Sequence, residues 1–570
     1  MKKQNTMFLG PGFPTGFWPV RPGFSSLLDL GERFSRLLTS PCGRRYSSAV
    51  DRLGDLVLLR GVTRPGSRVG RKLGRLLLVP FLVLFAFAAV GAPSRAITVV
   101  EASYTPPAPE DFSTLSWTQA FVRLHAKMSR EYAFTAWKHI NWWALYSEYW
   151  YRIAGAEGAN DEAAYYLGLR GYIHELRDGH VGIKAADVAA QQTMTEVQRK
   201  IAGGGFGLIA TRLDDGGVIV SWVKPLGPAA RAGIKQGASL LTWGGAPVAK
   251  ALAGTSTVLG PSQPTFARTM YEQARFLVRA PVGATREVSF KNRGAGACGT
   301  VRLRAVDDGL ETLTMTDAAS ILNFGWPERM VEHRILPGNV GYVRIYAEID
   351  LPEQLPGDHT PTLELFRAAI GEFIDANVAG VMVDIRANSG GSDRMAADLL
   401  SSFYDRATFY EYQNYIVPPK GAFEIWIADD ATGEYMSPGE GISIEPAARR
   451  YAGPVVALVD NGCISSGEGV AMGIQNLPNG RVVGFSGTNG SFGMSGDAAM
   501  MPGGYMIDWP FGQSLDERKA VQIDTRDGRG GVRPDVRVPM TWSNALMAAS
   551  GKDVVLEYGL RELGRMRLGL

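Results

Sequence analysis

The chain has 570 residues, of which 45% are hydrophobic and 10% aromatic, so it can bury more than one core, and roughly three or four domains are expected. Its three cysteines, Cys42, Cys298 and Cys463, are too few and too far apart for a disulfide framework, a zinc site or a redox motif. Residues 1–96 carry 15 Lys and Arg against 4 Asp and Glu, a net charge of +11, so the whole-chain value of +3 leaves −8 for the remainder. This acidic remainder excludes a basic nucleic-acid-binding face.

The amino-terminal part predicts an export signal. Residues 76–92 form an apolar run with a basic flank and small residues after it, so residues 69–96 have the pattern of a cleaved signal peptide. Residues 1–68 are rich in Gly, Pro, Ser and Arg without periodicity, which predicts a disordered leader or a translation start further along the chain. The alternative is an uncleaved transmembrane anchor, because the apolar run just reaches spanning length. We therefore expect an exported protein, periplasmic or secreted, with membrane association only if 76–92 is retained.

Residues 97–195 are expected to form a helical domain. Between residues 112 and 176, three stretches place apolar or aromatic side chains at three- and four-residue spacing, which is typical of amphipathic helices. The last stretch ends in RDGHVGIK, where Gly179 breaks the helix and His180 follows directly. A histidine in such a loop is by default a polar surface residue, so a role for His180 depends on what the rest of the sequence supplies.

The next segment, residues 196–305, predicts a small β-rich domain. Two strand-like runs surround an Asp-Gly-Gly turn, and a short Ala-rich helix and another strand follow. GFGL and GPAARAGIKQGASLLTWGG closely resemble a PDZ domain, whereas GGGFG alone would be read as a flexible linker. The resemblance implies that a peptide adds as a strand to the sheet edge while loop amides bind its terminal carboxylate. The loop residues are Gly205, Phe206, Gly207 and Leu208.

Residues 306–548 alternate predicted strands and helices. The strands are NVGYVRIYAEI, GVMVDIRANSGG, PVVALVD and GRVVGF, and helices such as TLELFRAAIGEFIDAN and MAADLLSSFY lie between them. This order predicts an α/β core with a largely parallel sheet. Residues 549–570 are left as a carboxy-terminal tail.

The stretch NGCISSGEGV, residues 461–470, lies where the buried strand PVVALVD passes into a helix of small and apolar residues. A side chain at such a junction is held on a sharp turn, and the first helical amides are free to bind negative charge. The junction is therefore a suitable position for a nucleophile. The alternative is that Ser465 or Ser466 caps the helix, as most serines before helices do.

Three separated motifs together resemble the carboxy-terminal processing peptidase and tricorn-core family of serine peptidases. They are GVMVDIRANSGGSDRMAADLL, PVVALVDNGCISSGEGVAMGIQNLPNGRVVG and GGVRPDVRV, which follow the PDZ-like segment and the DGH turn in this order. The resemblance covers about residues 110–540. It implies a crotonase-like or ClpP-like α/β architecture, a polypeptide substrate hydrolysed through an acyl-enzyme, and no metal or organic cofactor.

The resemblance also assigns site residues. The family's nucleophile lies three residues before the glutamate of the serine-rich turn, so Glu468 identifies Ser465, although Cys463 and Gly467 replace the family's usual flanking serines. The implied oxyanion donors are the backbone amides of Ser466, Gly390 and Gly391. Three polar residues of the DIRANSGG turn are expected to organise it rather than react: Asp384, Arg386 and Asn388.

A serine nucleophile needs a base. One branch of the family uses a lysine about 25 residues after the serine, and this chain has no lysine from residue 422 to residue 518. The tricorn-like branch takes a histidine from the segment before the PDZ domain, a position that His180 occupies. The acid of that branch lies shortly before the GVxPD element, which implies Asp527, with Asp524 in reserve. Asp178, beside the histidine, is expected to be a turn residue.

A different class of function uses the same fold. Proteins that resemble the vertebrate interphotoreceptor retinoid-binding repeats carry apolar ligands on it without catalysis, and a fold alone does not decide between the two. Because Ser465, His180 and an acid are all available, the sequence favours an exported serine endopeptidase over a ligand- or peptide-binding protein.

Overall fold

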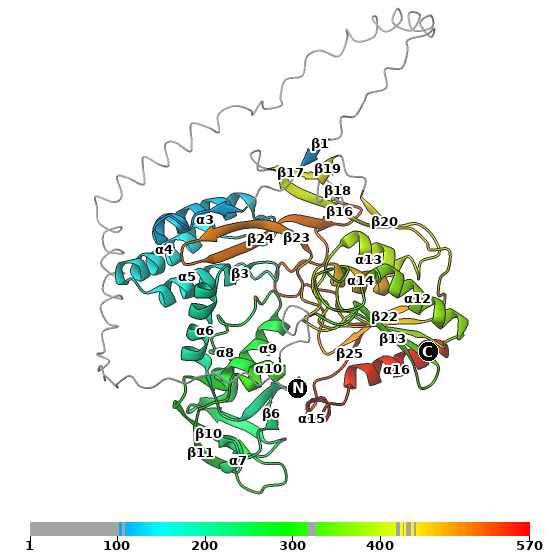
Figure 1. The fold of residues 1–570 in the computed structure, drawn as a ribbon. Helices are drawn as coiled ribbons and strands as arrows, with labels where there is room; N and C mark the ends of the chain where they lie inside the picture. Colours follow the sequence, from blue (N-terminus) through cyan, green and yellow to red (C-terminus); the bar gives the residue numbers. More distant parts are fainter. Residues whose placement is uncertain are drawn as a thin grey trace, which may run out of the picture. The chain divides into compact units, whose positions relative to one another are not determined.

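A computed structural model of the chain describes residues 102–104, 109–316, 326–417, 422–425, 427–428, 435–437 and 441–569 (Figure 1). The expected leader and signal segment, residues 1–96, lie outside these residues. Within them, no helix is both long enough and apolar enough to cross a membrane.

The predicted parallel sheet is present at the centre of the carboxy-terminal part. Its six strands follow the order β13-β14-β15-β21-β22-β25, and every neighbouring pair except β13-β14 is parallel. The strands are β13 (Val331–Leu336), β14 (Val340–Ile345), β15 (Val381–Asp384), β21 (Val455–Leu458), β22 (Gly480–Gly484) and β25 (Val536–Arg537). Short continuous apolar runs form β15 and β21 because helices cover both faces of such a sheet.

Alternate side chains of these strands belong to two separate hydrophobic cores. Val381 and Val455 pack with helices on one face, and Met382 and Val456 pack with α16 on the other. The helices of the first face are α12 (Thr362–Asp375), α13 (Asp393–Leu400) and α14 (Ser466–Gln475). The second face is covered by α16 (Val554–Arg567), and α15 (Trp542–Ala549) precedes it. The predicted tail is therefore a helix of the core.

A second sheet joins distant parts of the chain. Its strands follow the order β17-β16-β24-β23-β2, with β20 beside β16 and β3 beside β24. They are β2 (Glu110–Asp111), β3 (Gly182–Ala185), β16 (Thr408–Val417), β17 (Ala422–Ile425), β20 (Ile442–Ile444), β23 (Gly493–Met501) and β24 (Tyr505–Leu515). Because β3 pairs with β24, the residues just after His180 are hydrogen-bonded to a strand from the carboxy-terminal part.

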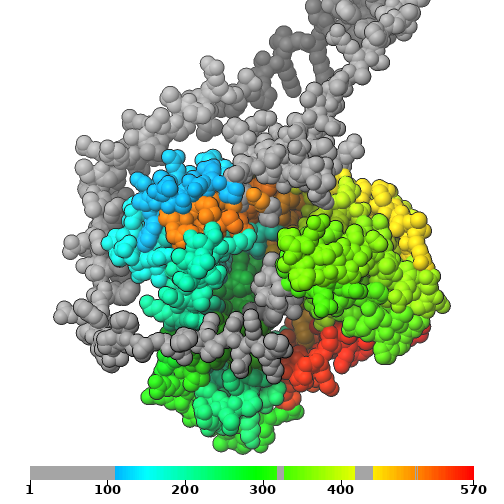
Figure 2. Space-filling view, in the orientation of Figure 1, coloured from blue at the N-terminus to red at the C-terminus, as the bar shows by residue number. Residues whose placement is uncertain are grey.

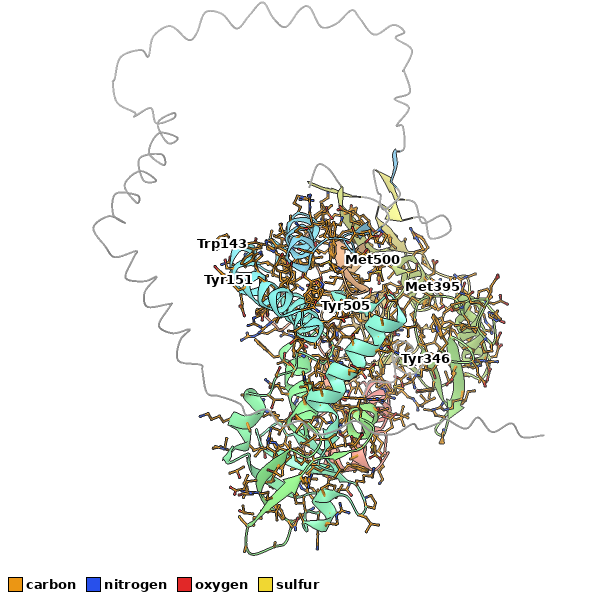
Figure 3. The ribbon with its side chains drawn as sticks, turned by 60° about the vertical axis from the view of Figure 1, so that its left-hand side comes forward. Trp143, Tyr151, Tyr346, Met395, Met500 and Tyr505 are labelled. Carbon is orange, nitrogen blue, oxygen red and sulfur yellow. The ribbon has the colours of Figure 1, made fainter. Side chains whose placement is uncertain are left out.

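The expected amino-terminal helices pack on this second sheet. They are α3 (Trp117–Glu131), α4 (Trp142–Ala159) and α5 (Glu162–His174), and α6 (Val188–Ala202) follows. Tyr505 and Trp509 of β24 are fully buried in the same core as these helices, and Figures 1 and 2 show the orange strands against the blue and cyan helices. Figure 3 shows Tyr505 on the inner side of the helices and Trp143 and Tyr151 on the outer side of α4. The helices therefore share a core with strands from the carboxy-terminal part of the chain.

The middle segment forms an antiparallel sheet of the order β11-β10-β7-β6-β5, with β8 beside β7. Its strands are β5 (Leu208–Arg212), β6 (Val218–Val223), β7 (Ser239–Trp243), β8 (Ala246–Pro247), β10 (Thr285–Lys291) and β11 (Gly299–Arg304). Its helices are α7 (Pro228–Arg231), α8 (Val248–Ala253) and α9 (Phe266–Leu277). The predicted strand, turn, strand, short helix and strand all occur in order. Strand β5 is an edge strand, and α9 packs beside it.

Short elements complete the described chain. A small sheet joins β12 (Val306–Asp307), β4 (Gly204–Gly205) and β9 (Arg279–Ala280), and α10 (Glu311–Thr316) follows it. Another joins β1 (Ala102–Tyr104), β19 (Tyr435–Ser437) and β18 (Ile427–Ala428). The middle segment contacts the core through Asp214, which accepts a hydrogen bond from Arg537, and through Trp542, which donates to the carbonyl of Gly237 (3.0 Å).

Candidate active site

Ser465 occupies the junction between β21 and α14, as the motif predicts. It stands at the N-cap position with φ 60° and ψ −135°, and its side chain makes no capping hydrogen bond. The hydroxyl of Ser466 donates to Glu348 (2.8 Å), so it does not cap the helix either. The capping alternative is therefore wrong for both serines. Ser465 instead has a backbone conformation that residues other than glycine rarely adopt, and such conformations are characteristic of functional sites.

The Gly-Gly turn after β15 lies directly against this serine. A Cβ placed on Gly390 would lie 2.5 Å from the Cβ and 3.1 Å from the Oγ of Ser465, and Gly390 also has φ +76°. Only glycine meets both conditions. The parallel pairing of β15 with β21 thus brings the two motifs together in space, although they are far apart in the sequence.

Two of the three predicted oxyanion donors are available. Ser466 is the first residue of α14, and its N–H has no acceptor within the helix. Gly391 forms a parallel bridge with Glu348. In this bridge the N–H of Glu348 donates to the carbonyl of Gly390, and the carbonyl of Glu348 accepts the N–H of Ser392. The N–H of Gly391 therefore faces away from the bridge. The N–H of Gly390, in contrast, donates to Asn388 Oδ1 (2.8 Å) and is occupied. Gly390 contributes space for Ser465 instead of a donor.

A fully buried carboxylate connects the two donor segments. Glu348 Oε2 accepts the hydroxyl of Ser466 (2.8 Å), and Oε1 accepts the side-chain amide of Asn388 (2.8 Å), the residue that holds Gly390. Burial raises the pKa of Glu348 to about 7, although both hydrogen bonds lower it. Asn388 therefore organises the turn, as expected. Asp384 and Arg386 do so too, because Asp384 is buried and bonded to Arg386, which also pairs with Asp553 (2.7 Å).

Glu468 fixes the other side of the serine turn. Its carboxylate accepts the N–H groups of Gly490 and Ser491 (both 2.8 Å), and burial raises its pKa to about 7. The carbonyl of Ser491 in turn accepts the N–H of Ser465 (3.0 Å). The hydroxyl of Ser491 accepts the N–H of Gly179 (2.8 Å). Ser491 therefore joins the turn of Ser465 to the residue that precedes His180.

His180 lies in this neighbourhood with a carboxylate beside it. Asp178 Oδ1 accepts the backbone N–H of His180 (2.9 Å) and lies 3.8 Å from its Nδ1, which has no hydrogen-bond partner among the described residues. Burial lowers the pKa of His180, while Asp178 acts in the opposite direction. No hydrogen bond joins His180 to Ser465 in the described part of the chain. Catalytic hydrogen bonds are often long in free enzymes and shorten when substrate binds.

The structure separates the two acids that the sequence proposes. Asp527 is exposed, and its Oδ1 accepts the N–H of Arg529 (3.0 Å), so it adjoins a surface turn instead of His180. Asp524 is buried and lies 3.2 Å from Lys138, which also pairs with Asp178 (2.9 Å). The carboxylate next to the histidine is therefore Asp178, which the sequence suggested only as a turn residue.

Several residues of the site carried no sequence signal. Lys138 belongs to the amino-terminal helical segment, Ser491 and Asp508 to the second sheet and its loop, and Glu348 to the loop that follows β14. Asp508 pairs across β24 and β3 with Gly182, two residues after His180. Only Asp178 could have been found, from its place in RDGH. The other residues are brought to the site by the tertiary packing of segments that are separate in the sequence.

The four residues of the predicted peptide-binding loop lie in different environments, and only the last two adjoin an open sheet edge. Gly205 lies in β4 between two strands, and a Cβ there would lie 2.1 Å from the carboxylate of Asp308, so close packing explains this glycine. Phe206 is fully buried in the core of the middle segment. Gly207 (φ +71°) and Leu208 lead into the edge strand β5, so the end of the loop adjoins an open sheet edge.

No group of His, Cys, Asp and Glu that could hold a metal ion occurs among the described residues. The two cysteines within them, Cys298 and Cys463, are both free thiols. The site therefore offers hydroxyl, imidazole, carboxylate, ammonium and backbone amide groups for chemistry.

Comparison with known proteins identifies the core. Residues 339–538 match peptidase family S41, whereas no curated protein sequence matches the chain. Mature CPAF complexed with lactacystin and mature CPAF alone each align with a TM-score of 0.54 and 16% identity, covering 80% of this chain and 99% and 98% of their own. The photosystem II D1 C-terminal processing protease aligns with a TM-score of 0.32 and 19% identity, over 77% of this chain and 98% of its own.

The family match contains the Gly-Gly turn, the serine turn and the GVRPD element, which are the motifs that carried the sequence resemblance. Each CPAF alignment covers 80% of this chain, a larger share than the family match at residues 339–538. The chain therefore contains a peptidase family S41 domain at residues 339–538, and this match supports a serine-type peptidase.

Proposed function

We propose that the protein is an exported serine endopeptidase in which Ser465 is the nucleophile and His180 the general base. One observation carries this assignment. Ser465 adopts a strained conformation at the N-terminus of α14, against Gly390, and Ser491 joins its turn to that of His180.

The proposed reaction gives each of these groups a step. Ser465 Oγ attacks the peptide carbonyl as His180 takes its proton, and the resulting oxyanion accepts hydrogen bonds from the N–H groups of Ser466 and Gly391. Collapse breaks the C–N bond, and the imidazolium gives its proton to the departing amine. Water, activated by the neutral imidazole, then hydrolyses the acyl-enzyme. Asp178 orients the imidazole and stabilises its charged form.

Peptide recognition by the middle segment is part of the proposal. An extended peptide would pair with the edge strand β5 beside α9, with its terminal carboxylate at the amides of Gly207 and Leu208. Three observations support this arrangement: β5 is an edge strand, α9 flanks it, and the sequence resembles a PDZ domain.

A fluorophosphonate probe tests the nucleophile directly. It should label the protein at the peptide that contains Ser465, as located by mass spectrometry, and Ser465→Ala should abolish labelling. Ser486→Ala serves as the control, because the hydroxyl of Ser486 donates to the neighbouring carbonyl of Gly487 (3.2 Å). Labelling that persists in Ser465→Ala at the native rate would contradict the assignment.

A further inference from the structure

Lys138 is a buried cation from the amino-terminal helical segment that reaches the candidate active site. Its side chain is 6% exposed, and its Nζ lies 2.9 Å from Asp178 Oδ2 and 3.2 Å from Asp524 Oδ1, two carboxylates with no exposed surface. The Nζ also donates to the carbonyl of Arg177 (3.2 Å). The rings of Phe134 and Tyr132 flank the ammonium at 5.1 and 5.9 Å from their centroids.

The two carboxylates lead to opposite sides of the site. On the histidine side, the Oδ1 atom of Asp178 accepts a hydrogen bond from the backbone N–H of His180. Asp524 Oδ2 lies 3.3 Å from the N–H of Phe492, the residue after Ser491, whose carbonyl holds Ser465. Lys138 therefore connects the histidine side of the site with the serine side.

Lys138 also decides which oxygen of Asp178 faces the histidine. The Oδ2 atom is bonded to Lys138 and to the hydroxyl of Tyr132 (2.7 Å), so Oδ1 alone is left for His180. Without a cation, two buried carboxylates could not both stay ionised, because like charges in a dry environment favour uptake of a proton by one of them.

We propose that Lys138 is a positioning residue for the peptidase reaction: its ammonium bridges Asp178 and Asp524, and so holds Asp178 in its orientation toward His180. The inference rests on the proposed role of His180 as the base. The family's other branch uses a lysine about 25 residues after the serine, and this chain has no lysine there. Lys138 comes from a different segment, and it acts through carboxylates instead of on the serine.

The charges around His180 give the expected direction of change. Burial lowers the pKa of His180, then Asp178 raises it, Lys138 lowers it and Asp508 raises it. Burial raises the pKa of Asp524 well above its usual range even beside Lys138, so Asp524, and not Asp178, is the carboxyl group of the pair that holds a proton more readily. The pKa of Asp178 stays below its usual value although burial opposes this, because Lys138 and His180 lower it. Loss of the ammonium should therefore raise the pKa of His180.

The test compares two buried lysines. Lys138→Met is compared with Lys127→Met, because Lys127 is also buried in the helical segment and pairs with Glu131 (2.5 Å). The full exported chain is used, and the rate of fluorophosphonate labelling is measured against pH. Lys138→Met should lower the maximal rate at least tenfold and move its acid limb to higher pH, whereas Lys127→Met should keep the native profile.

A second readout does not depend on activity. The chain has six histidines, so selective isotope labelling and NMR titration in a Ser465→Ala background can follow His180, with His180→Gln as the assignment control. The pKa of His180 should be higher in Lys138→Met than in Lys127→Met. An equal pKa and equal labelling rate in the two variants would overturn the inference.

Two further variants separate the remaining outcomes. If Lys138→Met does not fold, the double variant Lys138→Met with Asp524→Asn removes the buried ammonium together with the carboxyl group it contacts, and gives the same comparison. If His180→Gln labels at the native rate, the proposed base is wrong. If His180→Gln is inactive while the Lys138 variants behave as Lys127→Met does, only the inference about Lys138 fails.

Discussion

At the scale of single residues, the backbone of Ser465 is the strained element of the site, and its neighbours enforce the strain. The N–H of Ser465 donates to Ser491, and the carbonyl of Ser465 accepts the N–H groups of Glu468 (2.8 Å) and Gly469 (3.3 Å). A non-glycine residue at φ 60° and ψ −135° costs roughly 1–3 kcal/mol. These hydrogen bonds stabilise the conformation, which presents the Oγ at the junction of strand and helix.

Replacing the nucleophile or the base should have the same consequence. We expect Ser465→Ala and His180→Ala each to lower turnover by about 10³-fold or more, and the double variant to be scarcely worse, because the members of a catalytic unit are not additive. Turnover of a quenched peptide substrate measures this, with circular dichroism as the check on folding. A His180→Ala protein with near-native turnover would show that another base acts.

The pH dependence of that turnover follows from the burial of His180. The base must be neutral, and burial lowers its pKa from 6.5. Turnover should therefore rise with pH through a midpoint below 6.5 and be level at neutral pH. A pH–rate profile of kcat/KM, measured over the range in which the protein stays folded, checks this, and a midpoint above 7 would contradict it.

At the scale of elements, the site is assembled where β15 and β21 end side by side. Both strands are parallel, so the turns that follow them meet at the same edge of the sheet. Gly390 then contacts Ser465, and Glu348, from the loop after β14, forms hydrogen bonds to both turns. The element junction thus determines the distance between nucleophile and oxyanion donors.

A comparison of Gly390→Ala with Gly245→Ala should separate the effect of the contact with Ser465 from the effect of backbone strain. The new methyl group would meet Ser465 Cβ at 2.5 Å, while Gly245 has a similar backbone (φ +80°) with no atom within 4 Å. Both Gly390→Ala and Gly245→Ala should lose about 1 kcal/mol of stability from the positive φ. Only Gly390→Ala should also lose probe labelling, by tenfold or more. Equal labelling of the two folded variants would show that the contact is irrelevant to catalysis.

The edge strand β5 supplies the element-scale prediction for substrate capture. In the Ser465→Ala background, the full exported chain should bind a peptide with a free carboxy terminus at least tenfold more tightly than the same peptide amidated, because a charged carboxylate accepts stronger hydrogen bonds from the loop amides than a neutral carboxamide does. Isothermal titration calorimetry compares the two peptides. Equal affinities would exclude carboxylate capture by Gly207 and Leu208.

At the scale of the whole molecule, buried carboxylates make the stability depend on pH. Burial raises the pKa of three glutamates, Glu348, Glu411 and Glu468, to about 7 from an ordinary value of 4.5. Between these values the folded state binds more protons than the unfolded state, so this contribution to stability is present below pH 4.5 and is lost as pH rises through 7. The difference corresponds to at most about 3 kcal/mol per group.

Glu348→Gln should reduce that dependence. The neutral amide cannot titrate, so the decrease in Tm between pH 5 and pH 7 should be smaller in Glu348→Gln than in the native protein. Differential scanning calorimetry at both pH values measures the change, with the exposed Glu353→Gln as control. A slope that is identical in Glu348→Gln and Glu353→Gln would mean that Glu348 is ionised throughout this range.

Export is the other prediction for the whole chain. The apolar run 76–92 with its basic flank predicts cleavage near its end, so the mature protein should begin near Pro93 or Ile97. Amino-terminal sequencing of protein recovered from cells decides this. Recovery of a chain that still carries residues 1–68 would favour the membrane-anchor alternative.

The sequence by itself determined the features that depend on local pattern and on short motifs. The apolar runs of β15 and β21 predicted buried parallel strands, the three helical periods predicted α3, α4 and α5, and the DIRANSGG and NGCISSGEG motifs predicted the family that the comparison confirms. The position of Ser465 at a strand-to-helix junction follows from the same local signals, because hydrophobic period and turn residues are properties of neighbouring residues.

Only the tertiary structure decided which residues surround that serine. Lys138, Asp178 and Asp524 meet because β3 pairs with β24 and the helices pack on the same sheet, and no local pattern encodes such long-range pairings. For the same reason Asp527 could be proposed from motif spacing although its side chain lies at an exposed turn. Burial, which sets the charge of each carboxylate, is likewise a property of the packed molecule and not of the sequence around it.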